Sequence, residues 1–246
     1  MRLILTLALA AAVAGVATAA TGPPRPLVDK CGTSGLTASP FWLEASDGVR
    51  LYAVEEGAGP IGVVLAHESP GDLCGWLPYI AMLAHAGVRA LAFDFRGFGD
   101  SERPTSTRDF LAYGRDFRAA VARLRADGAS KVFVLGASFG GAAALTYAPS
   151  LRVDGVVSFS GETHIAGTGL DGLAAIPRLR APLLIVGSRH DPYLSVADAL
   201  RLLRRASSHD KRTALYPGGY HGWDLVEDAP YAAHVRTLVL AWLRAH

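Results

Sequence analysis

The sequence contains no asparagine and no glutamine, and it has three lysines against 21 arginines. Without a side-chain amide, an oxyanion site must rely on backbone N–H groups or other donors, and no N-linked glycosylation sequon exists. We attribute the excess of arginine over lysine to genome composition and derive no function from it.

Charged residues are also sparse, at 19% of the chain, and the formal net charge is +2. This balance offers no electrostatic attraction for nucleic acid or for an anionic membrane. No G-x-x-x-x-G-K-[ST] motif occurs, and no G-x-G-x-x-G follows a strand, which argues against a nucleotide site. With 246 residues, half of them hydrophobic, the chain is long enough for one α/β domain with a sizeable core.

Residues 1–19 have the features of a signal peptide. Arg2 gives a basic start, Leu3 to Val16 an apolar core, and Ala17-Thr18-Ala19 a cleavage motif. The alternative, an uncleaved membrane anchor, needs a longer apolar stretch and a stop-transfer charge cluster. We therefore expect cleavage, a secreted or periplasmic location, and no membrane association after the signal is removed.

Only two cysteines occur, Cys31 and Cys74, and both lie after the cleavage motif. In an oxidising compartment an even number of cysteines favours a disulfide, which would link the N-terminal arm to a loop of the domain; the alternative is two separate buried thiols. Prolines and glycines in residues 20–36 predict an extended N-terminal arm. We expect residues 37–246 to form a single domain.

Apolar runs typical of buried strands alternate with helical patterns from residue 61 onward. This alternation predicts an α/β fold, a mostly parallel sheet of about eight strands with helices on both faces. Two earlier strands around Asp47-Gly48 predict an antiparallel N-terminal edge.

About twenty residues separate the strand ending near Phe159 from the one starting at Pro182. This leaves room for a Gly-rich loop and a short helix near 172–176. We therefore expect a minimal lid and an open site. The predicted strands are 41–45, 49–55, 61–66, 88–93, 132–135, 153–159, 182–187 and 212–216, and the predicted helices 76–86, 107–127, 195–206, 230–244 and one after residue 138.

A serine lies in a G-x-S-x-G motif between a predicted strand and a predicted helix. The apolar run Val132–Leu135 stops at Gly136, Ser138 follows, and the helix starts at Phe139. Such a turn forces a strained backbone on the serine, and Gly136 and Gly140 leave room where strand and helix come close. We expect the serine hydroxyl at the carboxyl edge of the sheet, facing the N–H groups that begin the helix.

Five motifs together resemble the motif series of the α/β-hydrolase superfamily, and the resemblance covers nearly all of residues 40–246. The motifs are L-A-H-E-S-P-G at 65–71, D-F-R-G-F-G-D-S at 94–101, G-A-S-F-G-G at 136–141, G-S-R-H-D-P at 187–192 and Y-H-G at 220–222. The resemblance implies an α/β-hydrolase fold with G-x-S-x-G as its nucleophile elbow. It is specific to the superfamily and not to one activity. The 94–101 segment is expected to brace the floor of the site without a catalytic role.

In similar enzymes the serine is followed along the chain by an acid and then by a histidine. Asp191 and His221 follow predicted strands in this order, so the resemblance implies a triad of Ser138, His221 and Asp191. A serine hydroxyl needs a base that takes its proton, and the base needs a third group that holds its tautomer. Glu162 is the alternative acid. His190 is an alternative base, but chain order disfavours it.

The resemblance also implies two oxyanion donors, the backbone N–H groups of Ser69 and Phe139. Glu68 stands where the superfamily usually has glycine, which affects the backbone conformation of this loop. We interpret Glu68 as a solvent-facing loop residue; the alternative is a carboxylate near the site that repels anionic substrates or binds a polar group. His67-Glu68 does not begin an H-E-x-x-H zinc motif, because position 71 is a glycine.

The sequence therefore predicts an exported serine hydrolase, without cofactor or metal, that cleaves a carboxylic ester through an acyl-enzyme. Thioesters and amides are open alternatives, since no readable pattern encodes the acyl and leaving-group pockets. Two further alternatives are a catalytically silent binding protein with the hydrolase fold and an acyltransferase that uses the same triad. The expected partner is a small acyl substrate, and nothing in the sequence indicates an oligomeric state.

Overall fold

The computed structural model describes residues 22–32 and 35–246. The predicted signal peptide, residues 1–19, lies outside these ranges. Among the helices of the described residues, none combines the length and apolar character needed to span a membrane.

Eight strands of the described residues form one sheet in the order β1-β2-β4-β3-β5-β6-β9-β10. β2 pairs antiparallel with β1 and β4, and the remaining neighbours in the sheet pair parallel. This confirms the predicted mostly parallel sheet with an antiparallel N-terminal edge. The strands are β1 (Phe41–Glu44), β2 (Arg50–Glu56), β3 (Ile61–Ala66), β4 (Arg89–Phe93), β5 (Lys131–Ala137), β6 (Gly155–Phe159), β9 (Leu183–Ser188) and β10 (Lys211–Tyr216).

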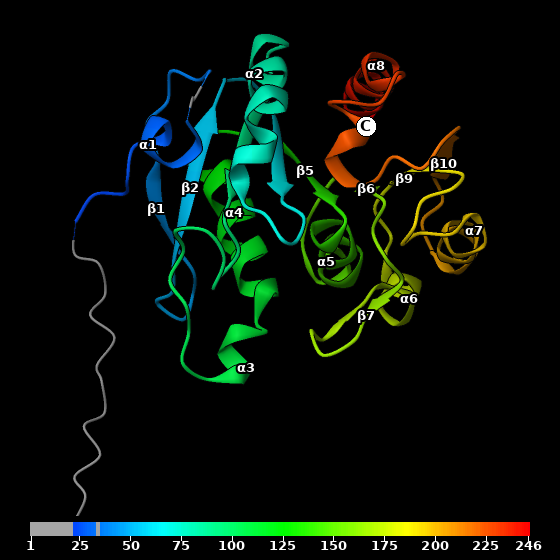
Figure 1. The fold of residues 1–246 in the computed structure, drawn as a ribbon, viewed down its shortest axis with the longest axis horizontal. Coiled ribbons are helices and arrows are strands. Elements are labelled where there is room, and N and C mark those ends of the chain that lie inside the picture. Colours follow the sequence, from blue (N-terminus) through cyan, green and yellow to red (C-terminus); the bar gives the residue numbers. More distant parts are fainter. Residues whose placement is uncertain (1–21, 33–34) are drawn as a thin grey trace, which may run out of the picture.

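Helices cover both faces of the sheet, and Figure 1 shows α2 and α8 on one side with α5 and α7 on the other. Each face has its own buried apolar cluster, because the strands are apolar on both faces. Phe93, Phe117 and Leu145 belong to the α4–α5–α7 side, and Trp76, Leu135 and Trp242 to the α2–α8 side. The helices are α1 (Leu27–Cys31), α2 (Leu77–His85), α3 (Thr107–Phe110), α4 (Tyr113–Ala126), α5 (Phe139–Tyr147), α6 (Gly172–Ala175), α7 (Val196–Arg205) and α8 (Ala232–Ala245), with short 3-10 turns η1 (Leu73–Trp76), η2 (Ala148–Ser150), η3 (Ile176–Arg178) and η4 (Gly222–Leu225).

The helix predicted within residues 107–127 is confirmed as α4, but the structure has a break before it and a separate short helix, α3, that was not predicted. The Arg96 guanidinium explains the break: Nη1 donates to the carbonyl oxygen of Asp109 at 2.7 Å. A continuous helix would pair that carbonyl with the N–H of Tyr113. The chain turns at Leu111 and Ala112 instead and begins again at Tyr113.

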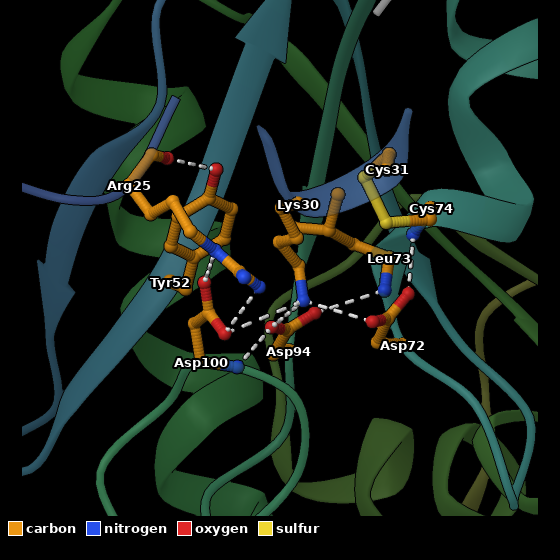
Figure 2. Close-up of a disulfide and its surroundings, with 9 residues drawn as sticks. All are labelled: Arg25, Lys30, Cys31, Tyr52, Asp72, Leu73, Cys74, Asp94 and Asp100. Carbon is orange, nitrogen blue, oxygen red and sulfur yellow. Dashed lines mark hydrogen bonds and ion pairs between the residues drawn. A yellow bond between two sulfur atoms is a disulfide. The ribbon is translucent and has the colours of Figure 1, made fainter. Parts of the chain in front are cut away.

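The N-terminal arm is not extended throughout, because Leu27–Cys31 forms the short helix α1. Pro26 stands at its N-terminal cap, where a missing N–H costs nothing, and Gly32 ends it in the left-handed conformation with φ 76°. The predicted disulfide is confirmed: Cys31 and Cys74 are bonded, with Cα atoms 5.5 Å apart (Figure 2).

The segment between β6 and β9 contains a hairpin that the sequence analysis did not predict. β7 (His164–Ile165) pairs antiparallel with β8 (Leu170–Asp171). The hairpin precedes α6, so the short helix expected near residues 172–176 is confirmed. The lid is therefore small, but it is a folded element and not a plain loop.

Candidate active site

Ser138 occupies the sharp turn between β5 and α5. Its backbone has φ 48° and ψ −113°, a conformation that side-chain-bearing residues rarely adopt. Its N–H donates to the carbonyl oxygen of Phe159 at 2.8 Å, and its carbonyl accepts from the N–H of Ala142 at 2.8 Å. These two hydrogen bonds hold the strained backbone on both sides of the Ser138 Cα. The residue is 7% exposed and lies at the carboxyl edge of the sheet.

The glycines around Ser138 are required by close approaches of backbone. A Cβ at Gly136 would overlap the backbone of Gly140 in the next turn. A Cβ at Gly140 would overlap the carbonyl of Ala66 and lie 2.6 Å from the carbonyl oxygen of His67. The elbow therefore packs directly against the start of the loop that follows β3. We name residues 67–76 the oxyanion loop, after the role that the superfamily resemblance implies for Ser69.

His221 and Asp191 form a hydrogen-bonded pair. Nδ1 of His221 lies 3.0 Å from Oδ1 and 3.1 Å from Oδ2 of Asp191. Asp191 is buried, and its Oδ1 also accepts the backbone N–H groups of Tyr193 at 2.8 Å and Leu194 at 3.0 Å. The carboxylate is thus held in place, and it can fix the imidazole with Nε2 free of the proton.

Burial alone would lower the pKa of the His221 imidazole. The hydrogen bond that the His221 ring donates to Asp191 and the negative charges of Asp191, Glu68 and Glu162 together outweigh burial and hold this pKa above its ordinary value. Burial likewise would raise the pKa of the Asp191 carboxyl, but its hydrogen bonds with His221, Ser160 and the backbone N–H groups of Leu194 and Tyr193 together outweigh burial and hold that pKa below its usual range. The pair therefore favours a charged carboxylate beside an imidazole that loses its proton only above its ordinary pKa.

The alternative acid and base lie in different surroundings. Glu162 is half-buried beside Ser138, and it acts on His221 through its charge without a hydrogen bond to it in the described part of the chain. Burial raises the pKa of the Glu162 carboxyl, with His221 opposing and Asp191 adding to the shift. His190 is exposed to solvent. The geometry thus favours Asp191 over Glu162 and His221 over His190.

Ser138, Asp191 and His221 all follow strands that run parallel in one sheet, so they lie at the same edge. In residues 22–32 and 35–246 no hydrogen bond joins the Ser138 hydroxyl to the His221 imidazole. Catalytic hydrogen bonds of this kind often tighten only when substrate binds. The structure brings these residues to one edge and fixes the histidine–aspartate pair.

Buried hydrogen bonds of His67 hold the backbone of the oxyanion loop close to Ser69. His67 is fully buried; its Nδ1 lies 2.7 Å from the carbonyl oxygen of Glu68, and its Nε2 accepts the N–H of Phe95 at 3.0 Å. Burial lowers the pKa of the His67 imidazole to about 4, so the ring is neutral near neutral pH. Ser69 itself is exposed and lines the same cavity as Ser138.

The interpretation of Glu68 as a solvent-facing residue is wrong. Its side chain is half-buried, and Oε2 accepts the backbone N–H of Trp223, two residues after His221, at 3.2 Å. A Cβ at Gly222 would overlap this carboxylate. Burial raises the pKa of the Glu68 carboxyl, opposed by the Trp223 N–H and by His221. Glu68 therefore links the oxyanion loop to residues 217–223, which we name the histidine loop.

A cavity of about 310 Å³ opens at Ser138. Its wall is mainly apolar and aromatic, and Glu162 is the carboxylate in it. The residues that line it are Ser69, Phe98, Phe110, Leu111, Tyr113, Ser138, Phe139, Glu162, Ile165, Gly167 and Thr168. The β7–β8 hairpin thus supplies one side, and Phe98 places the 94–101 loop against the floor as expected.

Comparison with solved structures agrees with this architecture. An esterase of Pyrococcus furiosus superposes with a TM-score of 0.75 at 17% identity, over 91% of this chain and 97% of that one. A putative dienelactone hydrolase of Klebsiella pneumoniae superposes with a TM-score of 0.68 at 18% identity, over 85% of this chain and 98% of that one. At these identities the likeness concerns the fold alone. The family model described as serine aminopeptidase, S33, matches residues 62–168.

The chain has the α/β-hydrolase fold, and its sequence is similar to members of that superfamily. Curated relatives of the chain include bifunctional epoxide hydrolase 2 of Rattus norvegicus, 34% identical over 88 residues. That match covers 36% of this chain and 15% of the rat enzyme. Epoxide hydrolase A of Mycobacterium tuberculosis is 33% identical over 141 residues, or 57% of this chain and 40% of the relative. The chain thus spans less than half the length of either relative.

Several residues that shape the site were not predicted from the sequence. The Ser188 hydroxyl donates to the carbonyl of Tyr220 at 2.7 Å and so holds the histidine loop to the end of β9. The ring of Tyr193 lies 4.7 Å from the His221 ring, centroid to centroid. The Trp223 ring packs so closely on the oxyanion loop that a Cβ at Gly75 would overlap it. No local pattern predicts these contacts. The one available signal is that Ser188 and Tyr193 lie close to Asp191 in the sequence.

Proposed function

We propose that this protein is an exported serine hydrolase that cleaves a carboxylic ester through an acyl-enzyme. The observation that carries the proposal is the strained Ser138 at the same sheet edge as a hydrogen-bonded His221–Asp191 pair whose carboxylate is buried. A strained backbone at one serine and a fixed histidine–carboxylate pair at the same edge are costly to maintain for folding alone. They have a use in nucleophilic catalysis.

In the proposed reaction His221 takes the proton of the Ser138 hydroxyl at Nε2 while the oxygen bonds to the acyl carbon. The carbonyl oxygen becomes an oxyanion, for which the N–H groups of Phe139 and Ser69 are the proposed donors. His221 then gives its proton to the leaving alkoxide as the carbon–oxygen bond breaks. Water, deprotonated by His221, then attacks the acyl carbon. The bond from that carbon to the Ser138 oxygen breaks, His221 returns the proton to this oxygen, and the carboxylic acid leaves. Asp191 stays ionised and stabilises the imidazolium.

The cavity supports a small or medium acyl group that is apolar or aromatic. Phe98, Phe110 and Tyr113 provide apolar contact area, and each buried methylene of the acyl group is worth about 0.8 kcal/mol. Glu162 and Glu68 place negative charge near His221, so we expect neutral substrates to be preferred over carboxylates. Thioesters and amides could react by the same steps, with the ester as the primary substrate.

Export is part of the proposal. The Cys31–Cys74 disulfide supports it, since such bonds persist in oxidising compartments. The leader features of residues 1–19 support it from the sequence. Mass spectrometry of the protein recovered from the periplasm or medium tests both: we expect an N-terminus near residue 20 and a mass two hydrogens below that of the reduced chain.

Steady-state kinetics on a substrate panel tests the reaction. The panel contains p-nitrophenyl esters of increasing acyl length, a thioester, an anilide and styrene oxide, the last because the curated relatives are named epoxide hydrolases. We expect ester cleavage by the wild type and none by Ser138→Ala. Turnover of the epoxide alone would overturn the ester proposal. A folded wild type that turns over nothing would favour the binding-protein alternative, and product formed only with an added alcohol would favour acyl transfer.

A further inference from the structure

The N-terminal arm places a lysine in the interior of the protein. The side chain of Lys30, in α1, is 1% exposed. Its ammonium lies 2.8 Å from Asp72, 3.0 Å from Asp94 and 4.0 Å from Asp100 (Figure 2). A lysine is almost never fully buried unless its charge is paired. Here one ammonium stands among three carboxylates, in a cluster that belongs to neither the triad nor the cavity.

Two of these carboxylates hold the backbone of the oxyanion loop. Asp94 is fully buried, and its Oδ1 accepts the N–H of Leu73 at 2.9 Å, while Oδ2 accepts the N–H of Asp100 at 2.8 Å. Asp72 caps η1, since its Oδ1 accepts the N–H of Cys74 at 2.9 Å. Leu73 and Cys74 follow Ser69 within the same loop. The cluster therefore sets where that loop runs.

The cluster depends on the lysine for its charge balance. Without the ammonium, Asp72 and Asp94 would be two carboxylates in a shared, largely buried place. Like charges there cannot both stay ionised without cost, so one of them would take up a proton or turn away. A protonated or displaced carboxyl accepts backbone N–H groups less well, and Leu73 or Cys74 would lose its anchor.

The disulfide keeps the lysine in the cluster. Cys31 is the residue after Lys30, and Cys74 lies in the oxyanion loop itself, so the bond joins the arm to the loop that the lysine serves. Non-covalent contacts also hold the arm: the side chain of Leu27 is buried, and the Lys30 ammonium lies 5.2 Å from the centre of the Tyr52 ring. Arg25 pairs with Asp100 at the surface, and its carbonyl accepts the Tyr52 hydroxyl at 2.6 Å. The covalent link raises the effective concentration of the ammonium at its carboxylates.

We infer that Lys30 is a positioning residue for the oxyanion loop, and that the Cys31–Cys74 bond makes turnover sensitive to reduction. This inference rests on the proposed function, because Ser69 matters only if an oxyanion forms. A phosphine reductant breaks the sulfur–sulfur bond: phosphorus takes an oxygen from water and is oxidised, and each sulfur gains an electron and a proton. The arm is then held by non-covalent contacts alone, and the loop that carries Ser69 loosens.

The test uses the mature full chain. It compares wild type, with and without a phosphine, with four variants: Lys30→Met, Lys30→Met/Asp94→Asn, Arg25→Met and Cys31→Ser/Cys74→Ser. Ester turnover is expressed per active site titrated with a fluorophosphonate. An oxyanion donor acts in the transition state, so we expect kcat to fall about tenfold for Lys30→Met and for the reduced or serine forms, with KM little changed. Arg25→Met, which removes the exposed ion pair of the same arm, should stay within about twofold of wild type.

The Asp94→Asn change distinguishes a positioning role of Lys30 from a purely structural one, because only a positioning role predicts that kcat recovers in the double variant. It removes the unpaired charge but keeps an oxygen for the Leu73 N–H, so the double variant should recover most of the lost kcat. Unchanged kcat per titrated site in Lys30→Met and in the reduced wild type would overturn the inference, as would a double variant no better than Lys30→Met. If Lys30→Met does not fold, the reduced wild type decides by the same criterion.

The two proposals fail in different ways. An oxidised wild type that neither labels nor cleaves esters refutes the proposed function. An oxidised wild type that cleaves esters, and keeps its kcat when reduced, refutes only the inference about Lys30 and the Cys31–Cys74 bond. Hydrogen exchange gives an independent reading: the amides of Leu73 and Cys74 should exchange faster after reduction, while those of β5 should not change.

Discussion

At the scale of single residues, the contact between His221 and Asp191 explains why a histidine could serve as a base. Replacing Asp191 by asparagine keeps the shape but offers an NH₂ group to Nδ1. The imidazole would then carry its proton on Nε2, facing Ser138, and could not accept one. We expect Asp191→Asn to lower kcat by roughly 10³–10⁴ with KM little changed. Glu162→Gln is the matched control, and a larger loss there than in Asp191→Asn would reverse the assignment of the acid.

The charge of Glu68 should be visible in the pH profile of the enzyme. The base works only as neutral imidazole, so kcat/KM rises with pH through the pKa of His221. Glu68 is one of the carboxylates that hold this pKa up. In Glu68→Gln the amide oxygen still accepts the Trp223 N–H, but the charge is gone, so the pKa falls and the acid limb should move to lower pH.

A profile of kcat/KM against pH measures this shift. Asp228→Asn provides the control, since Asp228 is exposed and does not act on His221. An acid limb in Glu68→Gln that coincides with that of wild type, or moves to higher pH, would contradict the role given to Glu68.

The residues that carry their own local signal were placed correctly at the sheet edge from sequence. Ser138 has its glycines, and Asp191 and His221 each follow a strand in the expected order. Glu68 was misinterpreted because its partner, Trp223, lies 155 residues away along the chain. Lys30 gave no signal at all, because a lysine in a Pro- and Gly-rich arm reads as a solvated residue until its burial is known.

At the scale of elements, the turn after His221 must fit against the oxyanion loop. Gly222 has φ 57°, and a Cβ there would overlap the Glu68 carboxylate. Gly167 in the lid hairpin has φ 75° and open space around it. Gly→Ala at either site strains the backbone by about 1 kcal/mol, but only Gly222→Ala displaces a neighbour of His221.

We therefore expect Gly222→Ala to reduce kcat/KM by roughly tenfold or more while Gly167→Ala stays near wild type, a difference set by the misplacement of the base. Ester kinetics on both variants, with folding checked by circular dichroism, makes the comparison. Equal losses in the two variants would mean that backbone strain alone, without the Glu68 contact, accounts for the effect.

The strands of the main sheet were predictable because they are continuous apolar runs bounded by turn signals. The break between α3 and α4 was not, since it follows from the Arg96 guanidinium, which binds a carbonyl from 13 residues away. The β7–β8 hairpin was also missed. Its strands have two residues each, too short for any alternation to be recognised.

At the scale of the whole molecule, Arg96 is a buried charge that ties distant segments together. It pairs with Asp116 of α4 at 2.6 Å, both side chains being fully buried, and with Asp47 of the β1–β2 turn at 2.8 Å. Arg96→Met would leave Asp116 buried without its partner, and we expect a loss of about 3–5 kcal/mol in the free energy of unfolding. Arg125→Met, which removes an exposed pair with Asp154, should cost about 1 kcal/mol or less.

Urea denaturation of both variants measures the difference. The loss in the free energy of unfolding of Arg96→Met, relative to wild type, should be smaller at mildly acidic pH. Burial already raises the pKa of Asp116, so its carboxyl takes up a proton readily in the folded state once the arginine is gone. A deficit below that of Arg125→Met would show that the buried pair does not stabilise the fold.

The overall architecture was predictable because the order of strands and helices restricts a chain of this length to few topologies. The antiparallel edge, the parallel strands and the helices on both faces agree with the structure. Contacts between loops were not predictable, since they depend on which side chains meet once the sheet has formed. The candidate site is built mainly from such loops, which is why the positions of Ser138, Asp191 and His221 at the sheet edge were easier to predict than the contacts that support them.

The central claim is that Ser138 is an activated nucleophile, and labelling by a fluorophosphonate tests it most directly. The purified mature protein is incubated with the probe, digested and analysed by mass spectrometry, beside Ser138→Ala and His221→Ala. We predict one adduct, on the peptide that contains Ser138, no adduct in Ser138→Ala and labelling slowed by several orders of magnitude in His221→Ala. A folded wild type that remains unlabelled, or an adduct on another residue, would contradict the account.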